Sequence, residues 1–216
     1  MESFKNFLKT LRPAFTVTLC LMLVCGLAYP LALNGLSGLF FPHRAAGSLV
    51  EVEGKTYGAE YVGQEFTAPY FLKGRPSAVH YNTYFEAQDG TKTYSDGSEF
   101  GGLASGSQNM GPSNPALTER VQKDLDAFLA ANPDIRQEDI PTDLLTASGS
   151  GLDPHVSPEA AAVQLPAVSQ ASGLSMEKLQ EIVEAHTTGK MLGIFGEETV
   201  NVLLVNLDIA RAMDLI

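Results

Sequence analysis

The amino-acid sequence predicts an α+β protein with one N-terminal transmembrane helix followed by a single mixed α/β domain. Three observations predict this class. Residues 13–42 contain no Asp, Glu, Lys or Arg. Residues 48–62 alternate apolar and polar side chains around Gly54, as β-hairpins do, and helical spacing of apolar residues recurs after residue 114. About 170 residues remain beyond the apolar segment, which is enough for one domain with its own core.

The apolar segment has the length of a membrane-spanning helix. Because a helix rises about 1.5 Å per residue, roughly 20 residues cross a hydrocarbon core of about 30 Å. We therefore place the transmembrane helix at residues 13–35. The alternative is a cleaved signal peptide, which also has a basic start followed by apolar residues. The segment is longer than the roughly 7–15-residue core of such a signal, and no small-x-small cleavage site follows it.

Basic residues precede the apolar segment and predict its orientation. Positive charge beside a transmembrane helix favours the cytoplasmic side. We therefore expect residues 1–12 in the cytoplasm and residues 36–216 outside it. The chain is then a single-pass protein of the cell (plasma or inner) membrane, in contact with membrane lipid. The basic residues are Lys5, Lys9 and Arg12, against the single acidic Glu2.

The rest of the chain is strongly acidic. The whole chain has a net charge of −11, and its first 44 residues have four basic side chains and one acidic one, so residues 45–216 carry −14. This charge excludes nucleic acid as a partner, because the phosphate backbone would repel it. Two interpretations remain for the acidic surface: a solvated face that keeps the domain soluble, or a face that raises the local concentration of cations.

The expected elements of the domain follow from turn and cap signals. Residues 48–62 predict a β-hairpin, and the stretch from residue 86 to residue 114, with six glycines and five serines, predicts a long irregular Gly/Ser-rich loop. Asn114 and Pro115 fit the N-cap and first turn of a helix that ends at Asn132.

Two more helices and one strand are expected near the C-terminus. Ser157 begins a helix that Pro166 splits and Gly173 ends, and Ser175 begins the next. Residues 199–207 are rich in β-branched side chains and predict a buried strand.

The sequence contains no nucleotide-binding P-loop, no serine-hydrolase elbow and no spacing typical of a metal site. Ser150, Asp153 and His155 have the residue types of a hydrolytic triad, so an anchored extracytoplasmic hydrolase is one hypothesis. The alternative is a turn around Pro154 in which Asp and Ser act as caps and His155 lies at the surface. On this alternative the chain is a non-catalytic partner subunit.

Four stretches resemble a known family. They are GQEFTAPYFLKGRPSA at 63–78, GPSNPAL at 111–117, PTDLLTASGSGLDPHVSPEAAAVQLPAV at 141–168 and VNVLLVNLDIA at 200–210. With these motifs, nearly the whole chain resembles the C subunit of the Kdp-type potassium-transporting ATPase.

The resemblance implies a non-catalytic subunit of an ATP-driven K⁺ uptake pump. Its implied partners are an ATP-hydrolysing P-type subunit, a K⁺-channel-like subunit and a small single-span subunit. It also implies a role in complex assembly and a catalytic-chaperone role that raises the ATP affinity of the hydrolysing subunit. No cofactor would be held stably by this chain, and ATP would be met through the partner subunit.

Two sets of residues are candidates for contacts within such a pump. Residues 174–179 loosely resemble the ABC-transporter signature, which makes Ser175 and Lys178 candidate nucleotide contacts. Because ATP is cytosolic and the domain is expected outside, we favour an indirect effect on ATP affinity. The candidate partner contacts are Ser113, Asn114, Ser148, Ser150, Asp153 and His155.

Overall fold

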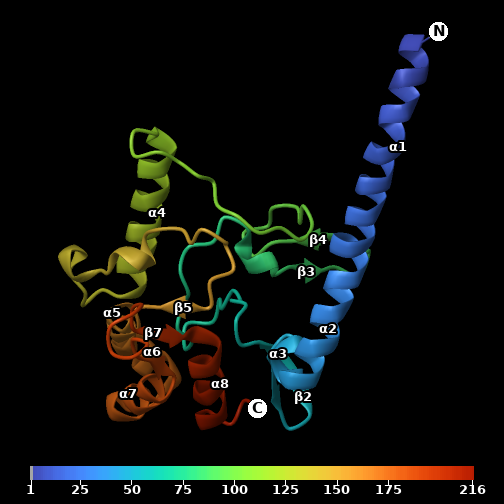
Figure 1. Cartoon of the computed structure of the whole chain (residues 1–216). Helices are drawn as coiled ribbons and strands as arrows, with labels where there is room; N and C mark the ends of the chain where they lie inside the picture. Colours follow the sequence, from blue (N-terminus) through green and yellow to red (C-terminus); the bar gives the residue numbers. More distant parts are fainter. Residues whose placement is uncertain (1) are drawn as a thin grey trace. The chain divides into compact units, whose positions relative to one another are not determined.

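The computed structural model describes the backbone of residues 2–216 and the side chains of residue 9 and residues 11–216 (Figure 1). The chain divides into two compact units, residues 1–50 and residues 51–216. The mixture of helices and short strands confirms the α+β class.

The first unit is dominated by a long continuous helix. It consists of α1 (Glu2–Leu23), a π-helical turn (Val24–Ala28) and α2 (Tyr29–Phe40), and the short helix α3 (Pro42–Ala45) follows. Pro30 has no N–H to donate to the carbonyl one turn earlier, so one hydrogen bond of the regular helical pattern is missing there. The wider π turn directly before Pro30 accommodates this missing bond.

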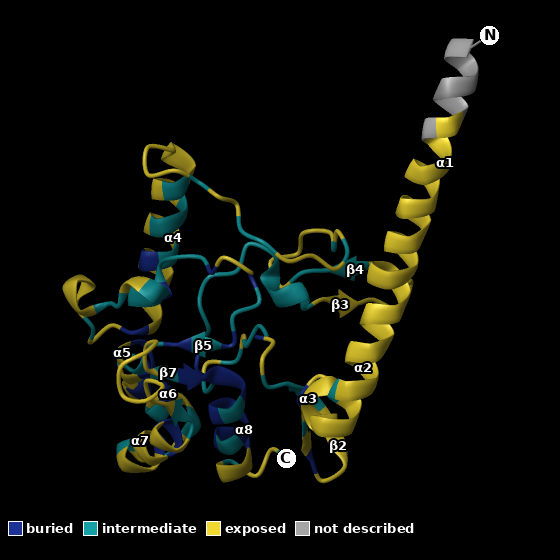
Figure 2. Ribbon diagram, viewed as in Figure 1, coloured by how far each residue is buried: buried dark blue, intermediate teal, exposed yellow. Residues whose placement is uncertain are grey.

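The apolar part of this helix is Leu11–Phe40, with a mean hydropathy of 2.1 and none of its most apolar stretch buried. Figure 2 colours nearly all of the described part of this helix as exposed. A helix that is apolar on every side requires a membrane or a partner to cover it. The helix is long and apolar enough to cross a membrane, while the predicted membrane boundaries at residues 13–35 stay a prediction.

A β-hairpin formed by β1 (Leu49–Val52) and β2 (Lys55–Ala59) confirms the expectation for residues 48–62. Its two-residue turn has positive φ at both positions, 52° at Glu53 and 80° at Gly54. Two successive positive φ values match the twist of the flanking strands, as in type I′ hairpin turns.

The predicted irregular loop at 86–114 is only partly irregular. Its first residues form a small antiparallel hairpin of β3 (Phe85–Glu86) and β4 (Lys92–Thr93). Tyr94 stacks on His80 with ring centroids 4.6 Å apart and lies edge-on to Phe100 at 5.3 Å. Strands of two residues are too short to produce a readable alternation of apolar and polar side chains, so this hairpin could not be predicted from the sequence.

The second unit contains five α-helices among the described residues, and their starts follow the expected caps. The Asn114 side chain accepts a hydrogen bond from the Ala116 N–H at 3.0 Å, and Gly173 ends a helix with φ 74°. Pro166 lies in the first turn of a separate helix, as predicted. The helices are α4 (Pro115–Ala131), α5 (Pro158–Ala162), α6 (Leu165–Ser172), α7 (Met176–Ala185) and α8 (Val202–Ala212).

A three-stranded antiparallel sheet with the order β5-β7-β6 lies among these helices. His155 pairs with Asn201, and Thr187 pairs with Val200. The strands are β5 (His155–Val156), β6 (Thr187–Thr188) and β7 (Thr199–Asn201), and single 3₁₀ turns lie at His80–Asn82, Gln137–Asp139 and Thr142–Leu144.

The strand predicted at 199–207 is wrong beyond Asn201. At that residue the side chain accepts a hydrogen bond from the Leu204 N–H at 3.1 Å and caps α8. A short apolar run that is buried on all sides fits a strand and a helix equally well. The missed signal was Asn201 itself, a good N-cap placed directly before the run.

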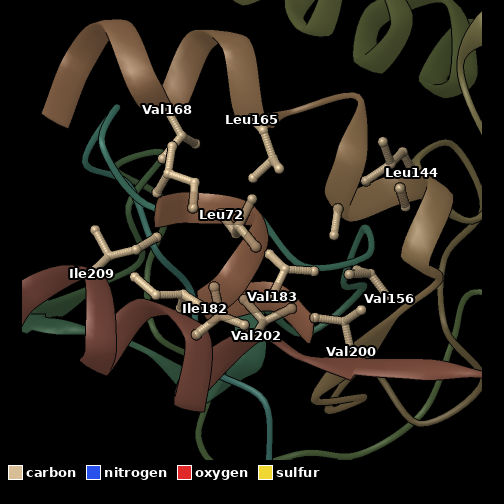
Figure 3. Packing of buried hydrophobic residues seen from close by; sticks show 14 residues of the cluster. Leu72, Leu144, Val156, Leu165, Val168, Ile182, Val183, Val200, Val202 and Ile209 are labelled. Carbon is tan, nitrogen blue, oxygen red and sulfur yellow. The ribbon is translucent and has the colours of Figure 1, made fainter. Parts of the chain in front are cut away.

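The core forms where α5, α6, α7 and α8 pack on the small sheet and on the segment around Leu72 (Figure 3). Leu72, Leu179, Val200 and Ile209 are each fully buried. The core therefore joins the middle of the chain to its C-terminus. Other buried members of this cluster are Leu144, Val156, Leu165, Val168, Ile182, Val183 and Val202.

Candidate functional site

The candidate residues at 148–155 form a turn that is fixed from within. Ser148 is buried, its N–H donates to the Pro76 carbonyl at 3.2 Å, and its hydroxyl accepts from the Gly151 N–H at 2.8 Å. A small hydroxyl that bonds the backbone three residues ahead stabilises a tight turn. Ser148 therefore shapes the turn and does not point into solvent.

Asp153 is the electrostatic centre of this turn. Its Oδ2 lies 3.1 Å from Nη1 of Arg75, and its Oδ1 accepts from the backbone N–H of His155 at 3.0 Å. Arg75 also donates to the Thr146 carbonyl at 3.4 Å. About a quarter of each charged side chain is exposed, so this half-buried pair is less screened than a surface ion pair.

Tyr81 and Ser77 connect the turn to the segment that carries Arg75. The Tyr81 hydroxyl donates to the Arg75 carbonyl at 2.7 Å, and the Ser77 hydroxyl donates to the Gly151 carbonyl at 2.7 Å. Burial, and after it the nearby charge of Asp153, raises the pKa of Tyr81. The phenol therefore stays protonated and remains a donor at any physiological pH.

Two further segments are pinned to the same turn. The Gly63 N–H donates to the Leu152 carbonyl at 2.9 Å, and the Gly106 N–H donates to the Ser150 carbonyl at 2.7 Å. We call residues 74–81 and 148–155, with Gly63 and Gly106, the loop junction. It brings together four segments that are remote in sequence, which makes it a rigid platform rather than a mobile loop.

The loop junction does not assemble a hydrolytic triad. The Ser150 hydroxyl accepts from the Leu152 N–H at 3.1 Å. His155 Nδ1 lies 3.8 Å from Asp153 Oδ1, which is longer than a hydrogen bond. No hydrogen bond between Ser150 and His155 occurs in the part of the chain that the structure describes. A nucleophile without a base in reach is not activated, so the geometry favours the turn interpretation over the hydrolase.

The other candidate residues lie at helix starts. Asn114 caps α4, and Ser113 before it is exposed. The Ser175 hydroxyl accepts from the Lys178 N–H at 3.2 Å and caps α7, while Lys178 Nζ pairs with Glu181 at 2.8 Å. These side chains are engaged within their own helices. Within residues 2–216 no hydrogen bond connects them to the loop junction.

Metal binding has no geometric support in the described residues, which contain no cluster of three or more His, Cys, Asp or Glu side chains. A cavity of about 590 Å³ lies between α4, α6 and the segment from Pro69 to Pro76, and Gly74 and Pro76 of this segment belong to the loop junction. Its lining includes Phe71, Phe128, Leu144 and Val168. Such a lining suits an apolar group better than a charged phosphate.

Lys73 lines this cavity and was missed by the sequence reasoning. Its ammonium group donates to the carbonyls of Phe66 and Ala68, each at 2.6 Å. Burial lowers the pKa of Lys73 to about 8, although the charge of Glu65 opposes that shift. A lone lysine between apolar residues carries no sequence signal of burial, because lysines are usually exposed.

The shifted pKa of Lys73 predicts a pH dependence of stability. Between the folded value of about 8 and the ordinary value of 10.5, the unfolded chain binds more protons than the folded one. Stability contributed by this group therefore rises as the pH rises through that window. We expect wild type to gain stability relative to Lys73→Met between pH 7.5 and 9.5, measured by urea unfolding at both values. An identical pH dependence of the two proteins would contradict the assignment.

One apolar helix that is long enough to cross a membrane is followed by a mixed α/β domain, which is the layout expected of a single-span membrane protein. The family model described as "KdpC: K+-transporting ATPase, c chain" matches residues 11–211. The chain therefore belongs to the KdpC family. It is an accessory, non-catalytic subunit of a K⁺-transporting ATPase complex.

Full-length relatives agree with this assignment. A relative from Clostridium kluyveri, named "Potassium-transporting ATPase KdpC subunit", is 57% identical over 210 residues, which cover 97% of this chain and 97% of the relative. Relatives of the same name from Clostridioides difficile and Rhodopseudomonas palustris are 51% and 46% identical. They match 97% and 93% of this chain, and 100% and 96% of their own lengths.

Proposed function

We propose that this subunit stabilises the assembled pump and raises the ATP affinity of the ATP-hydrolysing subunit without touching nucleotide. The observation that supports an indirect route is the state of the two candidate nucleotide contacts. Ser175 caps α7 and Lys178 pairs with Glu181, so both side chains are already engaged within their own helix. ATP would then be bound by the partner subunit alone.

The proposed arrangement places the N-terminus in the cytoplasm and the acidic domain outside it. The support is the positive charge before the apolar helix and the absence of charge within residues 13–42. The proposed partners are an ATP-hydrolysing P-type subunit, a K⁺-channel-like subunit and a small single-span subunit. The helix would brace the membrane region, and the domain would cap the channel-like subunit.

If this subunit changes ATP affinity at a distant site, then its own binding and the binding of ATP are linked by a coupling free energy. A subunit that binds one state of the pump more tightly shifts the population toward that state. A tenfold rise in ATP affinity corresponds to a coupling of about 1.4 kcal/mol. One half-buried ion pair or a few apolar contacts made in only one state would supply that amount.

ATPase kinetics of the purified complex test this proposal. We expect a complex that lacks this subunit to show a KM for ATP raised about tenfold, or to fall apart. In the intact complex, Ser175→Asp keeps the helix cap and Lys178→Gln removes the charge, so both should leave the KM for ATP within about twofold of wild type. A tenfold rise in KM for either variant in an assembled complex would instead indicate direct nucleotide contact.

A further inference from the structure

An exposed apolar tip lies on the connection between β6 and β7. Four large apolar side chains occur within five residues, and each is more than half exposed. Single exposed apolar residues are ordinary on soluble domains, whereas a contiguous group of this kind marks an interaction site. The residues are Met191, Leu192, Ile194 and Phe195, with exposed fractions of 71%, 79%, 75% and 62%. We call residues 191–195 the apolar tip.

The backbone of the apolar tip is already folded into a turn before any partner binds. The Met191 N–H donates to the Phe195 carbonyl at 2.8 Å, and the Phe195 N–H donates back at 3.0 Å. The Gly193 N–H donates to the Lys190 carbonyl at 3.0 Å. These hydrogen bonds close the turn, and the four apolar side chains on it are exposed. A pre-formed turn loses little conformational entropy when it binds.

The base of this tip is fixed to the core of the domain. Thr187 pairs with Val200 across the β6–β7 ladder, and Val200 is fully buried. A protrusion on such a base holds a defined direction relative to the domain. A partner that binds the apolar tip can therefore limit the movement of the β5-β7-β6 sheet.

Charge discriminates among the surfaces that the tip could meet. Lys190 lies 3.7 Å from Glu197, whose side chain is 86% exposed, and Glu198 follows. Loops and helices that bind anionic lipid carry an excess of Lys and Arg, which this loop lacks. A second copy would bring another domain with net charge −14, and the two would repel. The chemistry that fits is a protein groove with an apolar floor and a basic rim.

We propose that the apolar tip docks into an apolar groove with Lys or Arg at its rim on another subunit of the pump. This inference rests on the proposed function, since it requires the assembled complex. The tip supplies a few anchoring side chains, as hot spots do, and the apolar helix supplies most of the remaining contact. Docking would restrain the β5-β7-β6 sheet and hence the orientation of the domain.

Site-specific photo-crosslinking in the intact complex tests the docking directly. A photoreactive amino acid at Ile194 should crosslink to another polypeptide of the complex. The same probe at Leu103, which is 83% exposed but lies in the Gly/Ser-rich stretch, is the matched control and should give at least about tenfold less product. A crosslink from position 194 only to lipid, only to a second copy of this chain, or to nothing overturns the proposal.

A charge substitution gives an independent readout. We expect Ile194→Glu to reduce the partner subunits retained after a detergent wash about tenfold, whereas Leu103→Glu leaves retention unchanged. Because Ile194 is exposed, an unaltered melting temperature of the isolated full chain is expected for both variants. If wild type retains no partners, the proposed function fails; if wild type and Ile194→Glu retain them equally, only the docking inference fails.

Discussion

Replacing Asn206 by Leu should lower the free energy of unfolding by about 3–5 kcal/mol. Asn206 is almost fully buried in α8, and its amide holds the backbone of Leu72 at both of its polar groups. The Leu72 N–H donates to Oδ1 at 2.8 Å, and Nδ2 donates to the Leu72 carbonyl at 2.9 Å. The substitution leaves a buried donor and a buried acceptor without partners, and each costs about 1–3 kcal/mol.

The matched control is Gln137→Leu, which makes the same kind of change at an exposed position. We expect it to alter stability by less than about 0.5 kcal/mol. Denaturant unfolding of the full chain in detergent measures both variants. If Asn206→Leu lowers the free energy of unfolding by less than about 1 kcal/mol, the two hydrogen bonds between Asn206 and the Leu72 backbone contribute little to stability.

Replacing Gly151 by Ala should destabilise the loop junction by about 2–4 kcal/mol. Gly151 has φ +69°, which an L side chain rarely adopts. An added Cβ would also lie 2.8 Å from the carbonyl oxygen of Gly106 and 2.7 Å from a methyl group of Val79. The carbonyl belongs to the backbone and has little freedom to move. Relief of the clash would separate the segments that the loop junction joins.

Gly149→Ala, two residues earlier, is the control for this prediction. An added Cβ there meets nothing within 4 Å, and its φ lies outside the strained region. Its melting temperature should match that of wild type, and that of Gly151→Ala should fall by several degrees. Equal melting temperatures for the two variants would contradict the account of the loop junction.

Local chemistry made much of the fold predictable from the sequence. Asn114, Ser157 and Ser175 mark helix starts because their side chains satisfy free N–H groups, and the structure places each at an N-cap. Gly54 and Gly173 mark a hairpin turn and a helix end because both positions require positive φ. Such signals act within a few residues, so a single sequence contains them completely.

The features that the sequence did not reveal depend on distant contacts. Asp153 was a candidate for its chemistry, but its partner Arg75 is 78 residues away and no local pattern links them. The strand expected at 199–207 became α8 because tertiary packing decides the state of a fully buried apolar run. The large apolar residues of the apolar tip would be expected in the core from the sequence, and only the structure reveals that they are exposed.

The side of the membrane on which the domain lies is the central claim, and one labelling experiment tests it. Both cysteines, Cys20 and Cys25, lie in the apolar helix, so the domain has none of its own. Leu103→Cys therefore adds a single accessible thiol at a position that is 83% exposed in wild type. In sealed right-side-out vesicles, a membrane-impermeant maleimide should label this variant before lysis. Labelling only after the vesicles are permeabilised would contradict the account.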